Sequence, residues 1–291
     1  MARTVRVLSE DVWFGEGPRW RNGRLWFSDF AERKVWSISP AGDLRAELEV
    51  GDSRPSGLGW TPDGDLLFVA MEGGEVRRVG ADGSVDRHAD LRPLSPWLWN
   101  DMVVGADGRA YAGEFGFDFN GEMDRRGLAS VVADHPAARL AVVHPDGRVE
   151  VAAEDMHFPN GSAISPDGRT LIVGETLARR LTAFDIGEGG RLSNRRVWAQ
   201  LGERLTDGVC LDAEGAVWFA NPAAPECVRV AEGGRVLEVI ETELPCFACM
   251  LGGESGRDLF ILTASWNPPG QPPRKGQILA VTVDVAHAGW P

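Results

Sequence analysis

The sequence predicts an all-β fold, a six-bladed β-propeller of four-stranded antiparallel blades. A turn centred on glycine and followed by an apolar strand recurs six times, with the glycines at positions 23, 64, 108, 168, 215 and 256. A second glycine turn follows in most copies, and few stretches keep the 3.6-residue apolar period of a helix. Repeated units of about 40 to 50 residues, each with two linked hairpins, are typical of propeller blades.

The first turn of each unit has the residues that a tight hairpin requires. An acidic or amide residue precedes the glycine in most copies, and Asp-Gly and Asn-Gly supply the positive φ angles of such turns. The corners with their apolar strands span residues 22–27, 63–68, 107–112, 167–172, 214–219 and 255–260. The second turns span residues 40–43, 81–84, 145–148, 189–191 and 232–235. Each unit is therefore expected to contain four strands.

The even spread of these units favours one domain over residues 1–291. A β-sandwich or two separate barrels are the alternatives, but the repeats leave little room for a domain boundary. The best helical stretch, residues 123–138, is interrupted by Gly127 and Pro136, so no sustained helix is expected there. Ring closure is expected to pair an N-terminal segment, residues 4–8, with the blade that contains residues 277–283.

Charge and composition exclude several classes of partner. The chain of 291 residues has 43 acidic and 30 basic residues, a formal net charge of −13, so nucleic acid and anionic membrane surfaces are not expected partners. No apolar run approaches the roughly 18 to 20 residues that span a bilayer, and the first residues do not resemble a signal peptide. A cytoplasmic protein is expected, a monomer or weak homo-oligomer that acts on a small molecule.

The four cysteines are expected to be buried thiols. Only Cys246 and Cys249 have Cys-x-x-Cys spacing, and neither a second such pair nor a nearby histidine completes a zinc site. Cys210 and Cys227 stand alone in the sequence.

Residues at one offset in every repeat should face one another around the channel of a propeller. Counting back seven to nine residues from each hairpin glycine leads to Glu16, Ser56, Asn100, Asn160, Asp207 and Phe247. We call these six positions the ring. Four of them carry a carboxylate or amide oxygen, and such groups are costly to bury unless a positive charge lies between them.

A hard divalent cation is the occupant that these oxygens favour. Oxygen ligands favour Ca²⁺, Mg²⁺ or Mn²⁺ over zinc, and three or four protein ligands leave coordination positions open to water or substrate. The alternative is that Asn-Gly and Asp-Gly are ordinary turn dipeptides. Recurrence of all four polar residues in register favours a shared metal site.

Several motifs resemble those of the gluconolactonase/regucalcin (senescence marker protein) family. They lie at residues 13–20, 158–168, 192–196 and 206–215, and the resemblance covers nearly the whole chain. It implies a six-bladed propeller that hydrolyses lactones with one divalent cation, expected to be Ca²⁺, with Mg²⁺, Mn²⁺, Zn²⁺ or Fe²⁺ as alternatives. It also implies that Glu16, Asn160 and Asp207 are the metal ligands and that Asn100 contacts the substrate.

The substrate pocket is expected to be less polar than a sugar requires. Sugar-lactone hydrolases of the family tend to have an arginine two residues before the Asn100 position, where this chain has Leu98. Asp118 aligns with a substrate-binding acid of some members. An insertion at residues 115–138 brings phenylalanines close to Trp97 and Trp99, and Trp99 is predicted to contact substrate. Packing between blades is the alternative role for these rings.

Metal-assisted hydrolysis of a lactone is the favoured chemistry. Asp207 is the predicted catalytic residue, either as the base for an attacking water or as the nucleophile. No Gly-x-Ser-x-Gly elbow or His-Glu-x-x-His spacing is present, and His157, the one histidine near the ring, is expected to be structural. A phosphotriesterase, an epoxide hydrolase and a non-catalytic Ca²⁺-binding propeller are the alternatives.

Overall fold

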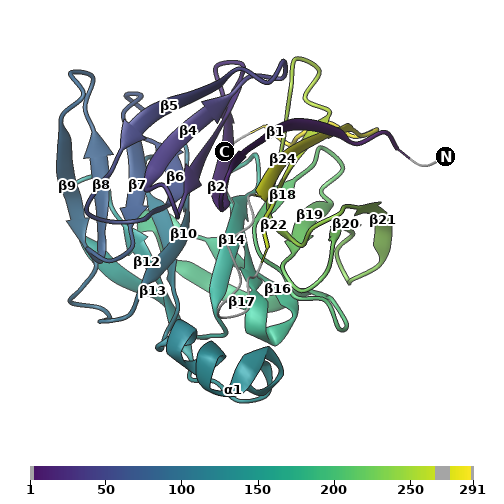
Figure 1. Cartoon of the computed structure of the whole chain (residues 1–291). Coiled ribbons are helices and arrows are strands. Elements are labelled where there is room, and N and C mark those ends of the chain that lie inside the picture. The colour runs from purple at the N-terminus through teal and green to yellow at the C-terminus, as the bar shows by residue number, and fades with distance from the viewer. Residues whose placement is uncertain (1–2, 266–275, 290–291) are drawn as a thin grey trace.

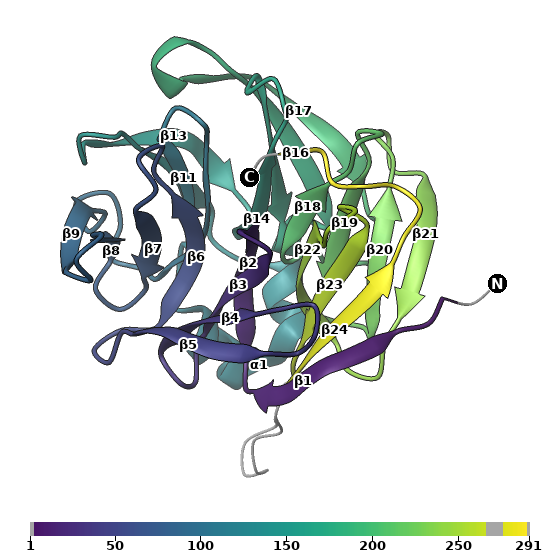
Figure 2. The ribbon, with the colours of Figure 1, turned by 90° about the horizontal axis from the view of Figure 1, so that it is seen from above.

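Six four-stranded antiparallel sheets surround a central axis in the computed structural model, which describes residues 3–265 and 276–289 (Figures 1 and 2). The first strands of the sheets contact one another in ring order, β2, β6, β10, β14, β18 and β22, and β22 returns to β2. The six-bladed propeller predicted from the glycine repeat is therefore confirmed.

Each of the first three blades runs outward from the axis in chain order. The first consists of β2 (Gly15–Arg21), β3 (Arg24–Asp29), β4 (Lys34–Ile38) and β5 (Leu44–Glu49). The second consists of β6 (Pro55–Trp60), β7 (Leu66–Ala70), β8 (Glu75–Val79) and β9 (Val85–Asp90). The third consists of β10 (Trp99–Val104), β11 (Ala110–Glu114), β12 (Ala138–Val143) and β13 (Val149–Met156).

The next two blades repeat this order, and the last one differs in its outer strand. The fourth consists of β14 (Pro159–Ile164), β15 (Thr170–Glu175), β16 (Arg180–Ile186) and β17 (Leu192–Gln200). The fifth consists of β18 (Val209–Leu211), β19 (Val217–Asn221), β20 (Glu226–Val230) and β21 (Val236–Glu241). The sixth consists of β22 (Cys246–Gly252), β23 (Asp258–Thr263), β24 (Gly276–Thr282) and β1 (Arg6–Val12).

The N-terminal strand closes the ring. β1 pairs antiparallel with β24, with Arg6 opposite Ala280 and Val7 opposite Leu279 (Figure 2). The expected closure is confirmed, and the paired segment continues to Val12, beyond the residues 4–8 that the sequence indicated. A closed ring leaves each blade between two neighbours, so the faces of the sheets are buried against one another.

The six hairpin glycines adopt the conformation that the sequence predicts. Their φ angles lie between 70° and 98°, in the region that residues with a side chain rarely adopt. The repeat therefore marks the hairpin between the first two strands of every blade.

One expectation about the insertion is wrong, because it contains the helix α1 (Phe119–Ala133). Gly127, with φ 73°, kinks this helix without ending it, and Asp134 caps its C-terminus before Pro136. Phe119 and Val131 anchor it by burial, so packing outweighs the interruption at Gly127. Two short 3₁₀ turns, η1 (Thr176–Ala178) and η2 (Glu188–Gly190), complete the described helices.

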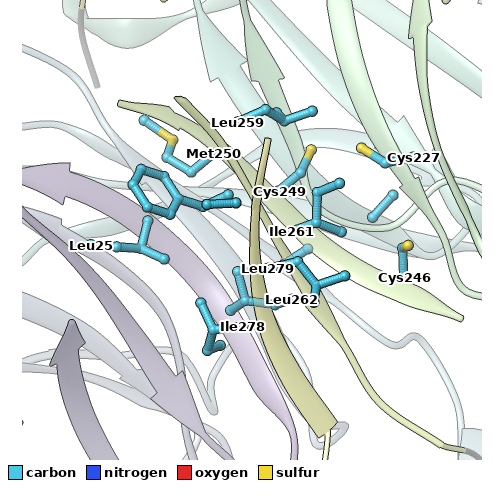
Figure 3. Packing of buried hydrophobic residues seen from close by; sticks show 14 of the residues in the cluster. Leu25, Cys227, Cys246, Cys249, Met250, Leu259, Ile261, Leu262, Ile278 and Leu279 are labelled. Atoms are coloured by element: carbon cyan, nitrogen blue, oxygen red, sulfur yellow. The ribbon is translucent and has the colours of Figure 1, made fainter. Parts of the chain in front are cut away.

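The core consists of apolar layers between blades, and the four cysteines lie in one of them. Cys210, Cys227, Cys246 and Cys249 are buried free thiols, and Figure 3 shows Cys227, Cys246 and Cys249 around Ile261. Burial raises the pKa of all four thiols, that of Cys246 to about 12. They are therefore protonated and unreactive at neutral pH, as expected for structural residues. Within the described parts of the chain, no helix is long and apolar enough to cross a membrane.

Candidate metal centre

A β-bulge lies at the ring position in the innermost strand of five blades. β2 takes one residue more than β3 between the pairs Glu16↔Ser28 and Arg19↔Trp26. The same surplus occurs at the start of β6, β10, β14 and β22. β18 instead begins two residues after Asp207. A bulge redirects a side chain out of the regular alternation of a strand, so this device gives the ring residues an orientation of their own.

Glycines next to the ring allow neighbouring inner strands to approach closely. A Cβ atom on Gly57 would lie 2.0 Å from the backbone nitrogen of Met102, and one on Gly161 would lie 2.4 Å from that of Val209. Neither distance is compatible with a side chain. The glycines of the Ser-Gly and Asn-Gly pairs at these positions therefore allow strands to approach closely. The alternative that these pairs are ordinary turn dipeptides does not apply to them.

Hydrogen bonds connect four ring residues from adjacent blades. The Oγ of Ser56 donates to Oδ1 of Asn100 over 3.2 Å, and Nδ2 of Asn100 donates to Oδ1 of Asn160 over 3.1 Å. The chain continues from Nδ2 of Asn160 to Oγ1 of Thr176 over 3.2 Å. Asn160 also hydrogen-bonds the carboxylate of Asp207. The structure thus joins the predicted residues of the second, third, fourth and fifth blades.

Two buried carboxylates of like charge, Glu16 and Asp207, belong to this ring. Glu16 and Asp207 are each only 7% exposed. Burial raises the pKa of Glu16, and the charges of Asp207 and Asp101 raise it further. Burial and then Asp101 likewise raise the pKa of Asp207. Neither carboxylate has an ion-pair partner among residues 3–265 and 276–289, and Oδ1 of Asp207 has no hydrogen-bond partner there.

A third carboxylate, Asp101, has a cationic partner. Its Oδ1 lies 3.7 Å from Nη2 of Arg19, and both side chains are buried. Arg19 also donates hydrogen bonds to the carbonyl oxygens of Pro18 and Met102. The sequence did not single out this pair, although both residues follow a ring residue closely in the chain, Arg19 after Glu16 and Asp101 after Asn100.

The donor set fits a hard divalent cation. Within the described residues, no group of three or more His, Cys, Asp or Glu side chains is spaced to hold a metal, so carboxylates alone do not make a site. Glu16 and Asp207 supply two carboxylates, and Asn160 and Asn100 supply amide oxygens. The unpartnered Oδ1 of Asp207 is the atom that most requires a positive neighbour.

A hydrophobic cap lies at the same end of the blades as the ring. It consists of Met71, Phe115, Phe117, Phe119, Val131, Phe158 and Leu177, with Leu98 packed against it. Phe158 and Leu98 each lie two residues before a ring asparagine. The helix α1 lies below the strands in Figure 1 and behind the middle of the ring in Figure 2, so the two views place it across this mouth.

Aromatic contacts make the cap continuous. The centroid of the phenyl group of Phe158 lies 4.6 Å from that of Phe115 and 4.7 Å from that of Phe119. The sixth ring residue, Phe247, packs against Phe14 at 4.5 Å. A buried apolar cluster therefore lies beside the oxygen donors of the ring.

Two residues that were predicted to contact substrate, Trp99 and Asp118, have surroundings that fit other roles. Trp99 is fully buried in the cluster between the second and third blades. Asp118 is exposed, and its side chain accepts a hydrogen bond from the backbone N–H of Gly121 as the N-cap of α1. Their surroundings are those of a packing residue and a helix cap.

His157 joins the helix segment to the fourth blade. Its Nδ1 lies 2.9 Å from Nε2 of His135, and its backbone N–H donates to Oε2 of Glu175 over 2.8 Å. Burial lowers the pKa of His157. These contacts agree with the expected structural role.

Comparison with known proteins places these features in a family. Residues 14–265 match the profile of the SMP-30/gluconolactonase/LRE-like region. Regucalcin of Danio rerio is 28% identical over 272 residues, which cover 89% of this chain and 85% of that protein. Regucalcin of Homo sapiens is 26% identical over 293 residues, which cover 95% and 93% of the two chains.

Solved structures share the fold. A calcium-binding protein, regucalcin of Agrobacterium tumefaciens, superposes with a TM-score of 0.82 at 22% identity and covers 100% of this chain and 97% of its own. A luciferin-regenerating enzyme has a TM-score of 0.82 at 19% identity, with coverage of 98% and 97%. A gluconolactonase of Xanthomonas campestris has a TM-score of 0.73 at 23% identity, with coverage of 96% and 89%.

Proposed function

We propose that this chain, which belongs to the SMP-30/gluconolactonase/LRE-like family, is a divalent-metal-dependent hydrolase that opens a lactone. The observation that carries the proposal is the pair of buried carboxylates, Glu16 and Asp207, without a cationic partner in the described residues. The gluconolactonase named among the relatives supports lactone hydrolysis, and the calcium-binding relative supports Ca²⁺ as the cation.

Glu16, Asn160 and Asp207 would hold the cation. When bound, a divalent cation polarises a carbonyl oxygen and stabilises the negative charge that develops on it during attack by water. The ring asparagines, which the hydrogen bond from Asn100 to Asn160 holds together, would orient the substrate beside these ligands.

Asp207 would take part in the proton transfer. One of its oxygens receives a hydrogen bond from Asn160, whereas Oδ1 is without a partner among the described residues. A carboxylate with one hydrogen-bonded oxygen and one unpartnered oxygen can accept a proton from an attacking water. Direct nucleophilic attack by the same oxygen is the alternative route.

The hydrophobic cap supports a substrate that is less polar than a sugar lactone. Leu98 packs against the cap at the position where sugar-lactone hydrolases tend to have an arginine. The cap would also exclude bulk water from the ring, which strengthens the electrostatic interactions there. We therefore infer that alkyl-substituted lactones are better substrates than gluconolactone.

A lactone panel assayed with added Ca²⁺, Mg²⁺ or Mn²⁺, and again with chelator, tests the proposal. Turnover of at least one lactone that is lost on chelation and restored by metal is expected. Absence of turnover of every lactone, ester, phosphotriester and epoxide at saturating metal would contradict the enzymatic function and leave a non-catalytic cation-binding protein. Turnover that is unaffected by chelation would contradict the metal dependence.

A further inference from the structure

A cleft lies on the third blade, lined by residues outside the ring. The cleft has a volume of about 420 Å³, and the residues that define it chemically are Ser95, Trp97, Glu114, Arg139, Glu154 and Asp155. We call it the outer cleft. These six residues come from the segment before β10, the end of β11, and strands β12 and β13. Its volume is in the range of pockets that take small organic molecules.

Glu114 is a buried carboxylate with one unpartnered oxygen. It is 2% exposed, and its Oε2 has no hydrogen-bond partner within the described residues. The side chain of Ser95 and the backbone N–H of Arg139 hydrogen-bond the carboxylate. A buried acceptor without a donor costs free energy, so the position is suited to a ligand that brings a donor.

Trp97 provides an aromatic wall. It is 42% exposed, which is unusual for the largest apolar side chain, and its backbone N–H donates to Oγ of Ser95 over 3.2 Å. This hydrogen bond holds Trp97 beside the residue that contacts Glu114. The face of an indole ring attracts cations as well as apolar groups.

The charge of the outer cleft favours a cation over an anion. Glu114, Glu154 and Asp155 contribute three carboxylates. The guanidinium of Arg139 is engaged, because Nη1 donates to the carbonyl oxygen of Leu94 and Nε lies 4.0 Å from Oε1 of Glu154. An anion would therefore meet a surplus of negative charge.

A second arginine at the rim is also engaged. Arg195 donates to the carbonyl oxygens of Glu154 and Asp155 over 3.0 and 2.8 Å and lies 3.5 Å from Glu175.

We propose that the outer cleft binds a small organic cation, with an ammonium or guanidinium head that donates to Oε2 of Glu114 and an apolar body that packs on Trp97. None of the residues that line this cleft belongs to the ring or to the hydrophobic cap. The ligand of the outer cleft belongs to a different chemical class, because the lactone site is proposed to take a neutral ester.

Three probes of similar shape test the charge preference. Benzylammonium, benzyl alcohol and benzoate would be titrated into the full chain and followed by ligand-observed NMR. Benzylammonium is expected to bind saturably and at least about tenfold more tightly than benzyl alcohol, since only it has a charge that Glu114 attracts. Benzoate is expected not to bind.

Variants test the residues. Glu114→Gln is expected to weaken benzylammonium binding by about tenfold and Trp97→Ala by about fivefold. Glu188→Gln removes an exposed carboxylate at η2 and is the matched control, with no expected change. Trp97 is partly exposed, so Trp97→Ala is expected to fold even if Glu114→Gln does not, and circular dichroism checks both.

Three results would overturn the proposal. They are absence of saturable benzylammonium binding to the wild-type chain, equal or tighter binding of benzyl alcohol or benzoate, and unchanged affinity in the folded Trp97→Ala variant. Loss of lactone turnover in the test of the proposed function would not affect this experiment, because it measures binding alone.

Discussion

Glu175 and Asp207 are both buried carboxylates, yet the chain treats them in opposite ways. Glu175 is 0% exposed and receives hydrogen bonds from Arg180, Thr182 and the backbone of His157. Burial alone would raise the pKa of Glu175, but these partners outweigh it and the net pKa is lowered. Asp207, 7% exposed, has a raised pKa, because burial and the charge of Asp101 act in the same direction.

The two carboxylates differ in the source of the positive charge that balances them. In the fourth blade, the chain places two arginines around one carboxylate, which is a structural solution. At the ring, Glu16 and Asp207 have no such partner among the described residues, so a bound cation is the group that would complete the site. The carboxylates are similarly buried, but only Glu175 has a positive partner within the chain. We therefore assign Glu175 a structural role and propose a functional role for Glu16 and Asp207.

The largest expected effect is on turnover. Asp207→Asn keeps the size of the side chain and removes the charge, so we expect turnover of any lactone substrate to fall by about a thousandfold. The stability of the metal-free protein should not fall, because a like charge is removed from the ring. Steady-state kinetics and thermal unfolding measure the two quantities. Retained activity together with a loss of stability would show that Asp207 is structural.

The next largest effect is expected from metal addition, which should stabilise variants of Asp207 and Glu175 to different extents. Ca²⁺ at a hundred times its dissociation constant is expected to raise the free energy of unfolding of the wild-type chain by about 2.7 kcal/mol. The gain should shrink in Asp207→Asn and persist in Glu175→Gln. Calorimetry with and without chelator measures it. An equal gain in wild type and Asp207→Asn would mean that the cation binds elsewhere.

Glu175→Gln should act on stability. We expect a loss of about 2 kcal/mol at neutral pH, because Arg180 and Arg195 lose a charged acceptor. The pKa of Glu175 is lowered in the folded state, so its stabilisation is present above the unfolded pKa of about 4.3 and is lost as pH falls through the lower folded value. The difference between wild type and variant should therefore shrink below about pH 4. A difference that grows on acidification would contradict this sign.

A change at the hydrophobic cap should alter selectivity between substrates more than the rate of turnover. Leu98→Arg places a cation beside the hydrophobic cap, and we expect the preference between an alkyl lactone and gluconolactone to shift by about tenfold toward gluconolactone. The ratio of the two kcat/KM values measures it. An unchanged ratio would indicate that Leu98 does not contact the substrate.

The smallest effect is expected at Ser56. Its hydroxyl donates to Asn100 but adds no charge to the ring, so Ser56→Ala should cost no more than about 1 kcal/mol of transition-state stabilisation. Kinetic comparison with Asp207→Asn checks the assignment of roles within the ring. Equal losses from the two variants would contradict it.

The fold could be predicted because it is periodic. The glycines between the first two strands of each blade have positive φ angles that few other residues tolerate, so the sequence repeats them visibly. The same period located the ring, and the structure joins Ser56, Asn100 and Asn160 by hydrogen bonds.

Features that depend on packing were not predictable in the same way. The β-bulges at the ring leave no sequence signal apart from the offset itself. The helix α1 forms around Gly127 because Phe119 and Val131 are buried, which a propensity argument cannot foresee. Trp99, which was predicted to contact substrate, is fully buried in the cluster between the second and third blades.

Anomalous scattering from crystals grown with saturating Mn²⁺ would test the central claim most directly, that a cation supplies the charge missing at the ring. We predict a single peak within about 2.6 Å of carboxylate or amide oxygens of Glu16, Asn160 and Asp207. A peak at another set of residues, or none at the ring while the metal is saturating, would contradict the claim.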